Sequence, residues 1–298
     1  MKKIIITGAS GLIGAHVVHL LSQANEVHAL SRSKIKSFSK NVIWHEVDLA
    51  GEVNYDRLPR DAEVLIYLAQ SDHFRDFPIR ASEIFQVNTA QVVKALDFSQ
   101  KTGVKSFIYA SSGGVYGFPE KRVSEGVTIP ASGNLGFYLS TKLCSEILAE
   151  NYAPFMNVVM LRFFFVYGAG QKRSMLIPRL VDSIKNGTTI TLQGENGIKI
   201  NPIHVSDAAK ALEASLTLKG CHRINIAGPN ILSLREISNI IAKSLGKTPV
   251  FNKILSSAPG NLIADIRCMQ EILTNPIITF DKGILDLIQI KNKNEYFN

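Results

Sequence analysis

Cysteines and long apolar segments are scarce in this sequence. Its 298 residues include three cysteines, Cys144, Cys221 and Cys268, which lie far apart and form no C-x-x-C pair. This usage argues against a disulfide framework and a zinc site, and it predicts reduced thiols in the core of a cytoplasmic protein. No apolar run is long enough to span a bilayer, and only three isoleucines follow the basic start, too few for a signal peptide. We therefore expect neither a bound metal nor a membrane partner.

Charged residues are also few, at 19%, and hydrophobic residues make up 46%, which is typical of a globular protein. Lysine and arginine total 33 against 25 acidic residues, a formal net charge of +8. The basic residues are scattered and no aromatic residues interleave a basic stripe, so we do not expect a nucleic-acid partner. An anionic small molecule and a merely basic surface both remain open.

Glycines are concentrated directly after the first predicted strand. The apolar segment 2–6 leads into T-G-A-S-G-L-I-G at positions 7–14, and 15–21 has the pattern of a helix. Gly8 can form the turn, Gly11 leaves room for a pyrophosphate, and Gly14 lets the helix pack on the strand. The helix start offers free N–H groups and a partial positive charge. The turn predicts a dinucleotide site, the alternative being a glycine-rich loop without a ligand.

Strand and helix patterns alternate along the first half of the chain. We predict strands at 26–30, 42–47, 64–69, 106–111 and 158–166, and helices at 83–101 and 137–151. This rhythm predicts an α/β fold, a Rossmann-like doubly wound parallel sheet with a smaller C-terminal substrate-binding lobe. Residues 1–166 would form the dinucleotide-binding domain, its sheet completed by later segments, and 167–298 mainly the lobe. Within the lobe we predict helices at 177–186, 205–218 and 233–245, the last with a capping box of Ser233 and Glu236.

Two further motifs carry chemistry. Tyr138 and Lys142 are spaced i, i+4 on a predicted helix and share a face. A neighbouring ammonium lowers the pKa of a tyrosine from about 10, which makes the phenol a usable acid or base. A strand ends at Ser111 and Ser112, so a hydroxyl there can hydrogen-bond a substrate oxygen. Taken singly, Tyr138 and Lys142 could be an ordinary surface pair, and the two serines could belong to a serine-rich turn.

The three motifs, in this order, resemble the extended short-chain dehydrogenase/reductase family, and more narrowly its NAD(P)-dependent nucleotide-sugar epimerase/dehydratase branch. Positions 7–14 match the family's T-G-x-x-G-x-x-G, and 111–117 match S-S-x-x-V-Y-G. Positions 161–168 match L-R-x-x-N-V-Y-G except at Phe165, 201–208 resemble a segment ending in H-V-x-D, and 223–246 resemble a late N-I-A-G-P…S-L-R-E-I stretch. The resemblance covers nearly the whole chain.

The resemblance implies a role for each matched residue. Tyr138 would be the catalytic acid/base, Lys142 would lower its pKa and hold the nicotinamide ribose, and Ser112 would orient the substrate oxygen. The expected cofactor-binding residues are Gly8, Ser10, Gly11, Leu12, Ile13, Ser31, Arg32, Asp48, Leu49, Leu68, Ala69, Gln70, Asn88, Tyr138, Lys142 and Phe163. The helices at 83–101 and 137–151 resemble those that pair two subunits in this family, so a homodimer is expected.

The end of the second predicted strand bears on the choice of cofactor. An acidic residue there would bind the ribose 2′-hydroxyl of NAD, but none is present. Arg32 instead offers a planar fork of donors suited to a 2′-phosphate, with Ser31, Ser33 and Lys34 beside it. We therefore expect NAD(P) binding with NADP favoured over NAD, solvated loop charge being the alternative.

The predicted reaction follows from what stands beside the catalytic serine. Dehydratases of this branch place an Asp-Glu pair where Gly113 and Gly114 stand here, so water elimination lacks its usual groups. An epimerase and a ketoreductase acting on a nucleotide-linked sugar remain open.

The substrate side departs from the family pattern. Phe165 replaces an asparagine that meets the nucleotide sugar, Ile200 stands where an arginine is common, and an expected arginine is missing near 258–261. Lys172, Arg173, Arg179 and Lys199 are alternative diphosphate ligands or simply surface charge. The departures keep two other functions open: a reductase of a non-nucleotide carbonyl compound, and a non-catalytic NAD(P)-sensing protein.

Overall fold

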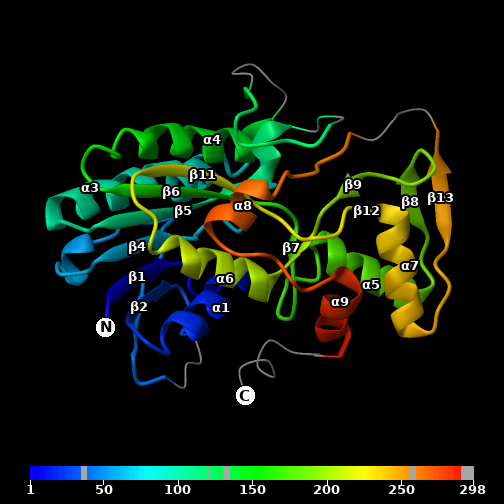
Figure 1. Cartoon of the computed structure of the whole chain (residues 1–298), viewed down its shortest axis with the longest axis horizontal. Helices are drawn as coiled ribbons and strands as arrows, with labels where there is room; N and C mark the ends of the chain where they lie inside the picture. Colours follow the sequence, from blue (N-terminus) through cyan, green and yellow to red (C-terminus); the bar gives the residue numbers. More distant parts are fainter. Residues whose placement is uncertain (35–38, 118, 120, 130–134, 256–259, 290–298) are drawn as a thin grey trace. The chain divides into compact units, whose positions relative to one another are not determined.

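A computed structural model describes residues 1–34, 39–117, 119, 121–129, 135–255 and 260–289 (Figure 1). The chain divides into two compact units. The first comprises residues 1–115, 129–162 and 209–224, and the second comprises 116–128, 163–208 and 225–298. Each unit is thus assembled from segments that are far apart in the sequence.

The first unit is built on a sheet that has seven strands within the described part of the chain, in the order β11-β6-β5-β4-β1-β2-β3. Its strands are β1 (Lys3–Thr7), β2 (Glu26–Ser31), β3 (Val42–Glu46), β4 (Val64–Tyr67), β5 (Ser106–Ser112), β6 (Asn157–Phe163) and β11 (Cys221–Ile226). The pairs β1–β2, β1–β4, β2–β3 and β4–β5 are parallel. The order proceeds outward in both directions from β1 and β4, which confirms the doubly wound sheet and places its topological switch between these two strands.

Helices cover both faces of this sheet. They are α1 (Leu12–Leu21), α2 (Ala81–Phe85), α3 (Gln91–Thr102) and α4 (Gly136–Glu150), with a π-helical turn at Gln86–Ala90 and a short 3₁₀ turn at Tyr55–Arg57. Figure 1 shows α3 and α4 on one face of the strands and α1 on the other. The helix α6 (Val205–Ser215) begins in the second unit and continues in the first.

The central strands are apolar because both of their faces are covered. Ile4, Ile5 and Ile6 of β1 and Leu65 and Ile66 of β4 are fully buried. A continuous apolar run, without polar alternation, is what a parallel strand between two helical layers requires. Burial of these side chains holds the carboxyl ends of β1 and β4 side by side.

The second unit has short strands and amphipathic helices. Its elements are β7 (Val166–Tyr167), α5 (Leu176–Asn186), β8 (Ile190–Gln193), β9 (Lys199–Ile200), β10 (Ile203–His204), β12 (Leu232–Ser233), α7 (Leu234–Leu245), β13 (Phe251–Ile254), α8 (Arg267–Ile272) and α9 (Phe280–Gln289), and a 3₁₀ turn at Gly113–Tyr116 joins the units. The predicted capping box is present at the start of α7: the Ser233 hydroxyl accepts the Glu236 N–H at 3.2 Å, and the Glu236 carboxylate accepts the Ser233 N–H at 2.7 Å.

Two expectations about local structure were wrong. The segment 158–166 is not one strand, because β6 ends at Phe163 and Phe165 adopts a left-handed φ of 43°, which a continuing strand cannot accommodate. The cysteines are free, as expected, but not in the core: Cys144 and Cys221 are exposed and Cys268 is half-buried. They occupy helix faces and an edge strand, positions that a count of cysteines does not reveal.

Candidate active site

The glycine turn after β1 has the conformation that the spacing predicts. Gly8 has a φ of +69°, and a Cβ there would lie 2.8 Å from the backbone nitrogen of Ala69. A Cβ on Gly14 would lie 2.1 Å from the carbonyl oxygen of Gly8, so only glycine lets α1 start against the turn. No side chain caps the start of α1 at Gly11, and its first turn has no acidic residue. The bare helix start and the glycine backbone fit a dinucleotide pyrophosphate.

The loop after β4 lies against this turn. The N–H groups of Leu68 and Ala69 donate to the backbone oxygen and the hydroxyl of Thr7, both at 3.3 Å. Thr7 is fully buried, whereas Gln70 is exposed at the end of the same short segment. The loop therefore runs from the glycine turn outward, and Gln70 lies at its exposed end.

The loops after β2 and β3 carry the remaining expected cofactor residues of the first unit. Ser31 is buried, accepts a hydrogen bond from Trp44 Nε1 at 3.1 Å and donates to the Ser33 carbonyl at 2.7 Å. Leu49 is buried, and the exposed Asp48 caps its own turn by accepting the N–H of Ala50 at 3.0 Å. Within the glycine turn, the expected contacts Ser10, Leu12 and Ile13 are half-buried.

Arg32 stands at the end of β2 with its side chain more than half exposed, and it forms an ion pair with Asp72. The hydrogen bond that Arg32 donates to Asp72 is the main cause that raises the pKa of Arg32, and the carboxylates of Asp48 and Glu83 add to it. Arg32 is therefore charged and lies in an acidic neighbourhood.

Tyr138, Lys142 and Ser112 converge at the carboxyl end of β5. The Tyr138 hydroxyl donates to Gln70 Oε1 at 3.0 Å, which links α4 to the loop after β4. The Lys142 ammonium is buried and donates to the carbonyl of Ala110 at 2.9 Å. Ser112 is the last residue of β5 and its hydroxyl accepts the N–H of Gly114 at 3.1 Å. The expected catalytic trio and one expected cofactor residue thus lie together.

The pKa values at this site differ from the expectation. Burial raises the pKa of Tyr138 to about 12, and a hydrogen bond with the Ser112 side chain partly opposes this rise. Burial lowers the pKa of Lys142 to about 7, against a smaller opposite effect of the Glu146 carboxylate. The lowering of the tyrosine pKa by Lys142 is not observed, because the Lys142 side chain is directed to the end of β5 and lies over the Tyr109 ring, 5.1 Å from its centroid.

Asn88 lies in the π-helical turn and is fully buried. Its side-chain oxygen accepts the N–H of Ser71 at 3.0 Å, and its side-chain nitrogen donates to Thr141 Oγ1 at 3.1 Å. Its carbonyl accepts the hydroxyl of Ser145 at 2.7 Å. Asn88 therefore holds the loop after β4 and helix α4 together, and π-helical turns of this kind are frequent at functional sites.

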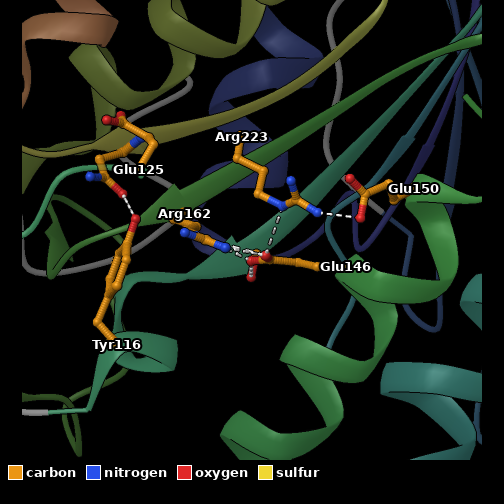
Figure 2. A network of polar contacts seen from close by, with 8 residues as sticks. Tyr116, Glu125, Glu146, Glu150, Arg162 and Arg223 are labelled. Atoms are coloured by element: carbon orange, nitrogen blue, oxygen red, sulfur yellow. Dashed lines mark hydrogen bonds and ion pairs between the residues drawn. The ribbon is translucent and has the colours of Figure 1, made fainter. Parts of the chain in front are cut away.

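A buried ionic network anchors the same helix one turn beyond Lys142 (Figure 2). Glu146 is 1% exposed and receives hydrogen bonds from Arg162 of β6 at 3.0 and 2.6 Å, and from the Ser111 hydroxyl of β5. Arg223 of β11 lies 3.8 Å from Glu146 and 2.5 Å from Glu150. The sequence analysis did not single out Glu146. Two features of the sequence could have identified it. Glu146 follows Lys142 by four residues on the same face of the helix, and Arg162 is a charged residue in a mostly apolar strand.

One expected cofactor residue, Phe163, and the positions considered for substrate binding belong to the second unit. Phe163 is buried at the end of β6, and Ile200 is fully buried in the apolar core of this unit, so its side chain contacts core residues. Arg173 is paired with Asp182 through a hydrogen bond of 2.9 Å from Nε. The other candidate diphosphate ligands, Lys172, Arg179 and Lys199, are exposed. Of the segment 258–261, Ala258 and Pro259 lie outside the described residues.

Two findings concern only the described part of the chain. No helix within it is long and apolar enough to cross a membrane. No group of three or more histidine, cysteine or acidic side chains within it could hold a metal ion.

The doubly wound sheet, the glycine turn and the Ser-Tyr-Lys cluster together define an extended short-chain dehydrogenase/reductase. Residues 4–227 match the NAD dependent epimerase/dehydratase family, and the chain belongs to that family.

Relatives of the chain are described as enzymes of nucleotide-sugar metabolism. The "uncharacterized UDP-glucose epimerase YtcB" of Bacillus subtilis strain 168 is 25% identical over 96% of each chain. A "dTDP-4-dehydro-6-deoxy-D-allose reductase" of a Streptomyces species is 24% identical over 91% of this chain and 90% of that protein. The solved structure of MoeE5 with UDP-glucuronic acid and NAD has 26% identity and a TM-score of 0.83, covering 96% of this chain and 98% of its own. A Bacillus cereus UDP-glucuronic acid 4-epimerase with NAD, at 24% identity, 95% and 94% coverage and a TM-score of 0.83, shows the same fold.

Proposed function

We propose that this protein catalyses NAD(P)-dependent hydride transfer at a carbon of a nucleotide-linked sugar, as an epimerase or a ketoreductase. The observation that carries the proposal is the convergence of Ser112, Tyr138 and Lys142 beside the glycine turn and the Gln70 loop. Epimerases and reductases of UDP- and dTDP-linked sugars among the relatives support the substrate class.

The chain's own residues account for proton transfer and positioning. Tyr138 exchanges a proton with the substrate oxygen, and Ser112 donates a hydrogen bond to the same oxygen and holds it against the phenol. Lys142, fixed on the Ala110 carbonyl, would hold the nicotinamide ribose. Bound NAD(P) would accept or deliver the hydride. The bare start of α1 and the backbone of Gly8 would hold its pyrophosphate.

The proposal predicts that Tyr138→Phe lowers kcat by roughly 10²–10⁴, because it removes the proton donor. The measurement is turnover with a panel of UDP-, GDP-, CDP- and dTDP-linked sugars and NAD or NADP, together with calorimetric titration of the dinucleotides. Tyr152 is a half-buried tyrosine just past α4, so Tyr152→Phe is the matched control and should keep the activity of the wild type. A Tyr138→Phe variant as active as the wild type contradicts the proposal.

The same assay distinguishes the two reactions. An epimerase removes a hydride and returns it to the other face, so the sugar inverts with no net consumption of cofactor. A ketoreductase oxidises one reduced cofactor for each carbonyl reduced. Gly113 and Gly114 stand where dehydratases of this branch have an Asp-Glu pair, so water elimination lacks its usual groups.

A reductase of a non-nucleotide carbonyl compound is the second candidate, favoured by Phe165 and by the burial of Ile200, which leave two expected polar ligands absent. Absence of affinity for every nucleotide sugar would support it. A non-catalytic NAD(P) sensor is the third candidate, and turnover of any substrate excludes it.

NADP is the cofactor we propose to be favoured, with Arg32 receiving the 2′-phosphate and Ser31 beside it.

We further propose a homodimer formed through α2, α3 and α4, because Phe85 and Ile147 on these helices are about half exposed, at 49% and 54%. A cytoplasmic location and two functional domains complete the proposal: residues 1–166 would bind the cofactor, with their sheet completed by later segments, and residues 167–298 would mainly bind the substrate.

A further inference from the structure

The ion pair of Arg32 and Asp72 joins two loops that flank the glycine turn. Arg32 follows β2 and Asp72 lies in the loop after β4, and these two strands are the neighbours of β1 on either side. Adjacent strands are about 4.8 Å apart, so the ends of β2 and β4 are separated by roughly 10 Å. The ion pair therefore spans the carboxyl-terminal end of β1, where the turn of residues 7–14 begins.

Asp72 is held in this position by its buried neighbour. Ser71 is 2% exposed, its N–H donates to Asn88 Oδ1 at 3.0 Å, and its hydroxyl donates to Glu83 Oε1 at 3.0 Å. The same hydroxyl accepts the N–H of His73 at 3.1 Å, so the backbone is fixed on both sides of Asp72. These hydrogen bonds therefore fix the position of the Asp72 carboxylate beside Arg32.

We propose that Asp72 is a cofactor-specificity residue, whose carboxylate competes with the 2′-phosphate of NADP for the guanidinium of Arg32. The inference rests on the proposed function, in which a dinucleotide binds at the glycine turn. A 2′-phosphate must replace the Asp72 carboxylate on Arg32 and also meets its negative charge. A ribose 2′-hydroxyl carries no charge and leaves the ion pair in place. Asp72 therefore reduces the preference for NADP that Arg32 alone would give.

The experiment is calorimetric titration of NADPH and NADH into the wild type and four variants, one of them a control. In Asp72→Asn the carboxylate is removed without a change in size, and an exposed pair of this kind corresponds to roughly a twofold to fivefold change in binding. We expect Asp72→Asn to bind NADPH tighter by about that factor and NADH within about twofold of the wild type. Arg32→Ala should bind NADPH more weakly, and the double variant should bind it as Arg32→Ala does, because Asp72 acts through Arg32.

Asp76→Asn is the matched control, since Asp76 is an exposed carboxylate of the same loop, paired with His73 at 2.7 Å. It should leave the ratio of NADPH to NADH affinity unchanged. An Asp72→Asn variant with an unchanged ratio, or an equal gain in the double variant, overturns the inference while the proposed function stands. Failure of the wild type to bind either dinucleotide overturns the proposed function, and with it this inference.

Discussion

Lys142 is a buried ammonium whose protonation is linked to folding. Burial lowers its pKa from 10.5 to about 7, whereas the unfolded chain keeps the ordinary value. Between these pH values the unfolded chain binds more protons at this site than the folded protein. The free energy of unfolding therefore rises with pH across this window, and the stability gained at high pH is lost as the pH falls toward 7.

This linkage predicts a pH-dependent effect of Lys142→Met. The wild-type free energy of unfolding should increase between pH 7.5 and 9.5 by up to about 1.4 kcal/mol per pH unit more than that of the variant. Urea denaturation at three pH values in this window measures the difference. Parallel pH profiles for the two proteins would contradict the assignment of a lowered pKa to Lys142.

The sequence singled out the three proposed catalytic residues because their types and spacing are local signals. Tyr138 and Lys142 share a helix face, and Ser112 ends a strand, so each follows from a short pattern. The pKa of Tyr138 depends on its burial and on the Ser112 side chain, and the pairing of Arg32 with Asp72 joins two loops that lie 40 residues apart in the sequence. Such contacts leave no short pattern, and the tyrosine pKa was accordingly expected to shift in the wrong direction.

Among the elements, α4 is held to the sheet by more than apolar packing. Glu146 accepts hydrogen bonds from Arg162 of β6, and both side chains are almost completely buried. Removing one partner of a buried pair leaves the other as an uncompensated charge. The pair fixes the turn of α4 directly after Lys142, and so it determines how the helix face that carries Tyr138 and Lys142 meets β5.

We expect Glu146→Gln to lower the free energy of unfolding by about 3–5 kcal/mol, since Arg162 would lose its counter-charge. Glu150→Gln, one turn later on the same helix, is the control, because Glu150 is half exposed and should cost less than about 1 kcal/mol. Urea denaturation of both variants at one pH measures the difference. Equal stabilities would show that the buried pair does not anchor α4.

The elements that the sequence predicted are those with a strong period or a long apolar run. β4, α4 and α7 fall into this group, and the capping box even fixed the start of α7. The edge strand β11 was not predicted, because its first three residues, Cys-His-Arg, lack an apolar pattern and are exposed or half-buried. The break between β6 and β7 was also missed, since a phenylalanine with left-handed backbone is contrary to its usual preference.

For the whole molecule, the exposed apolar side chains of α2 and α4 support the proposed dimer. Ile147→Glu should convert a wild-type dimer into a monomer, because it places a charge in a buried interface. Sedimentation velocity at micromolar concentration measures this. Ile272→Glu on α8 of the second unit, 39% exposed in the wild type, is the control and should remain dimeric. A wild type that sediments as a monomer would contradict the dimer.

The hydrogen bond between Trp44 and Ser31 gives the protein an internal optical reporter. Trp44 is the single tryptophan of the chain, and its indole N–H contacts the residue next to Arg32. Its emission therefore originates beside the ribose end of the proposed cofactor site, without interference from other indoles. Energy transfer from this one fluorophore to a reduced nicotinamide would follow cofactor binding in real time, in the unlabelled protein and in every variant that keeps Trp44.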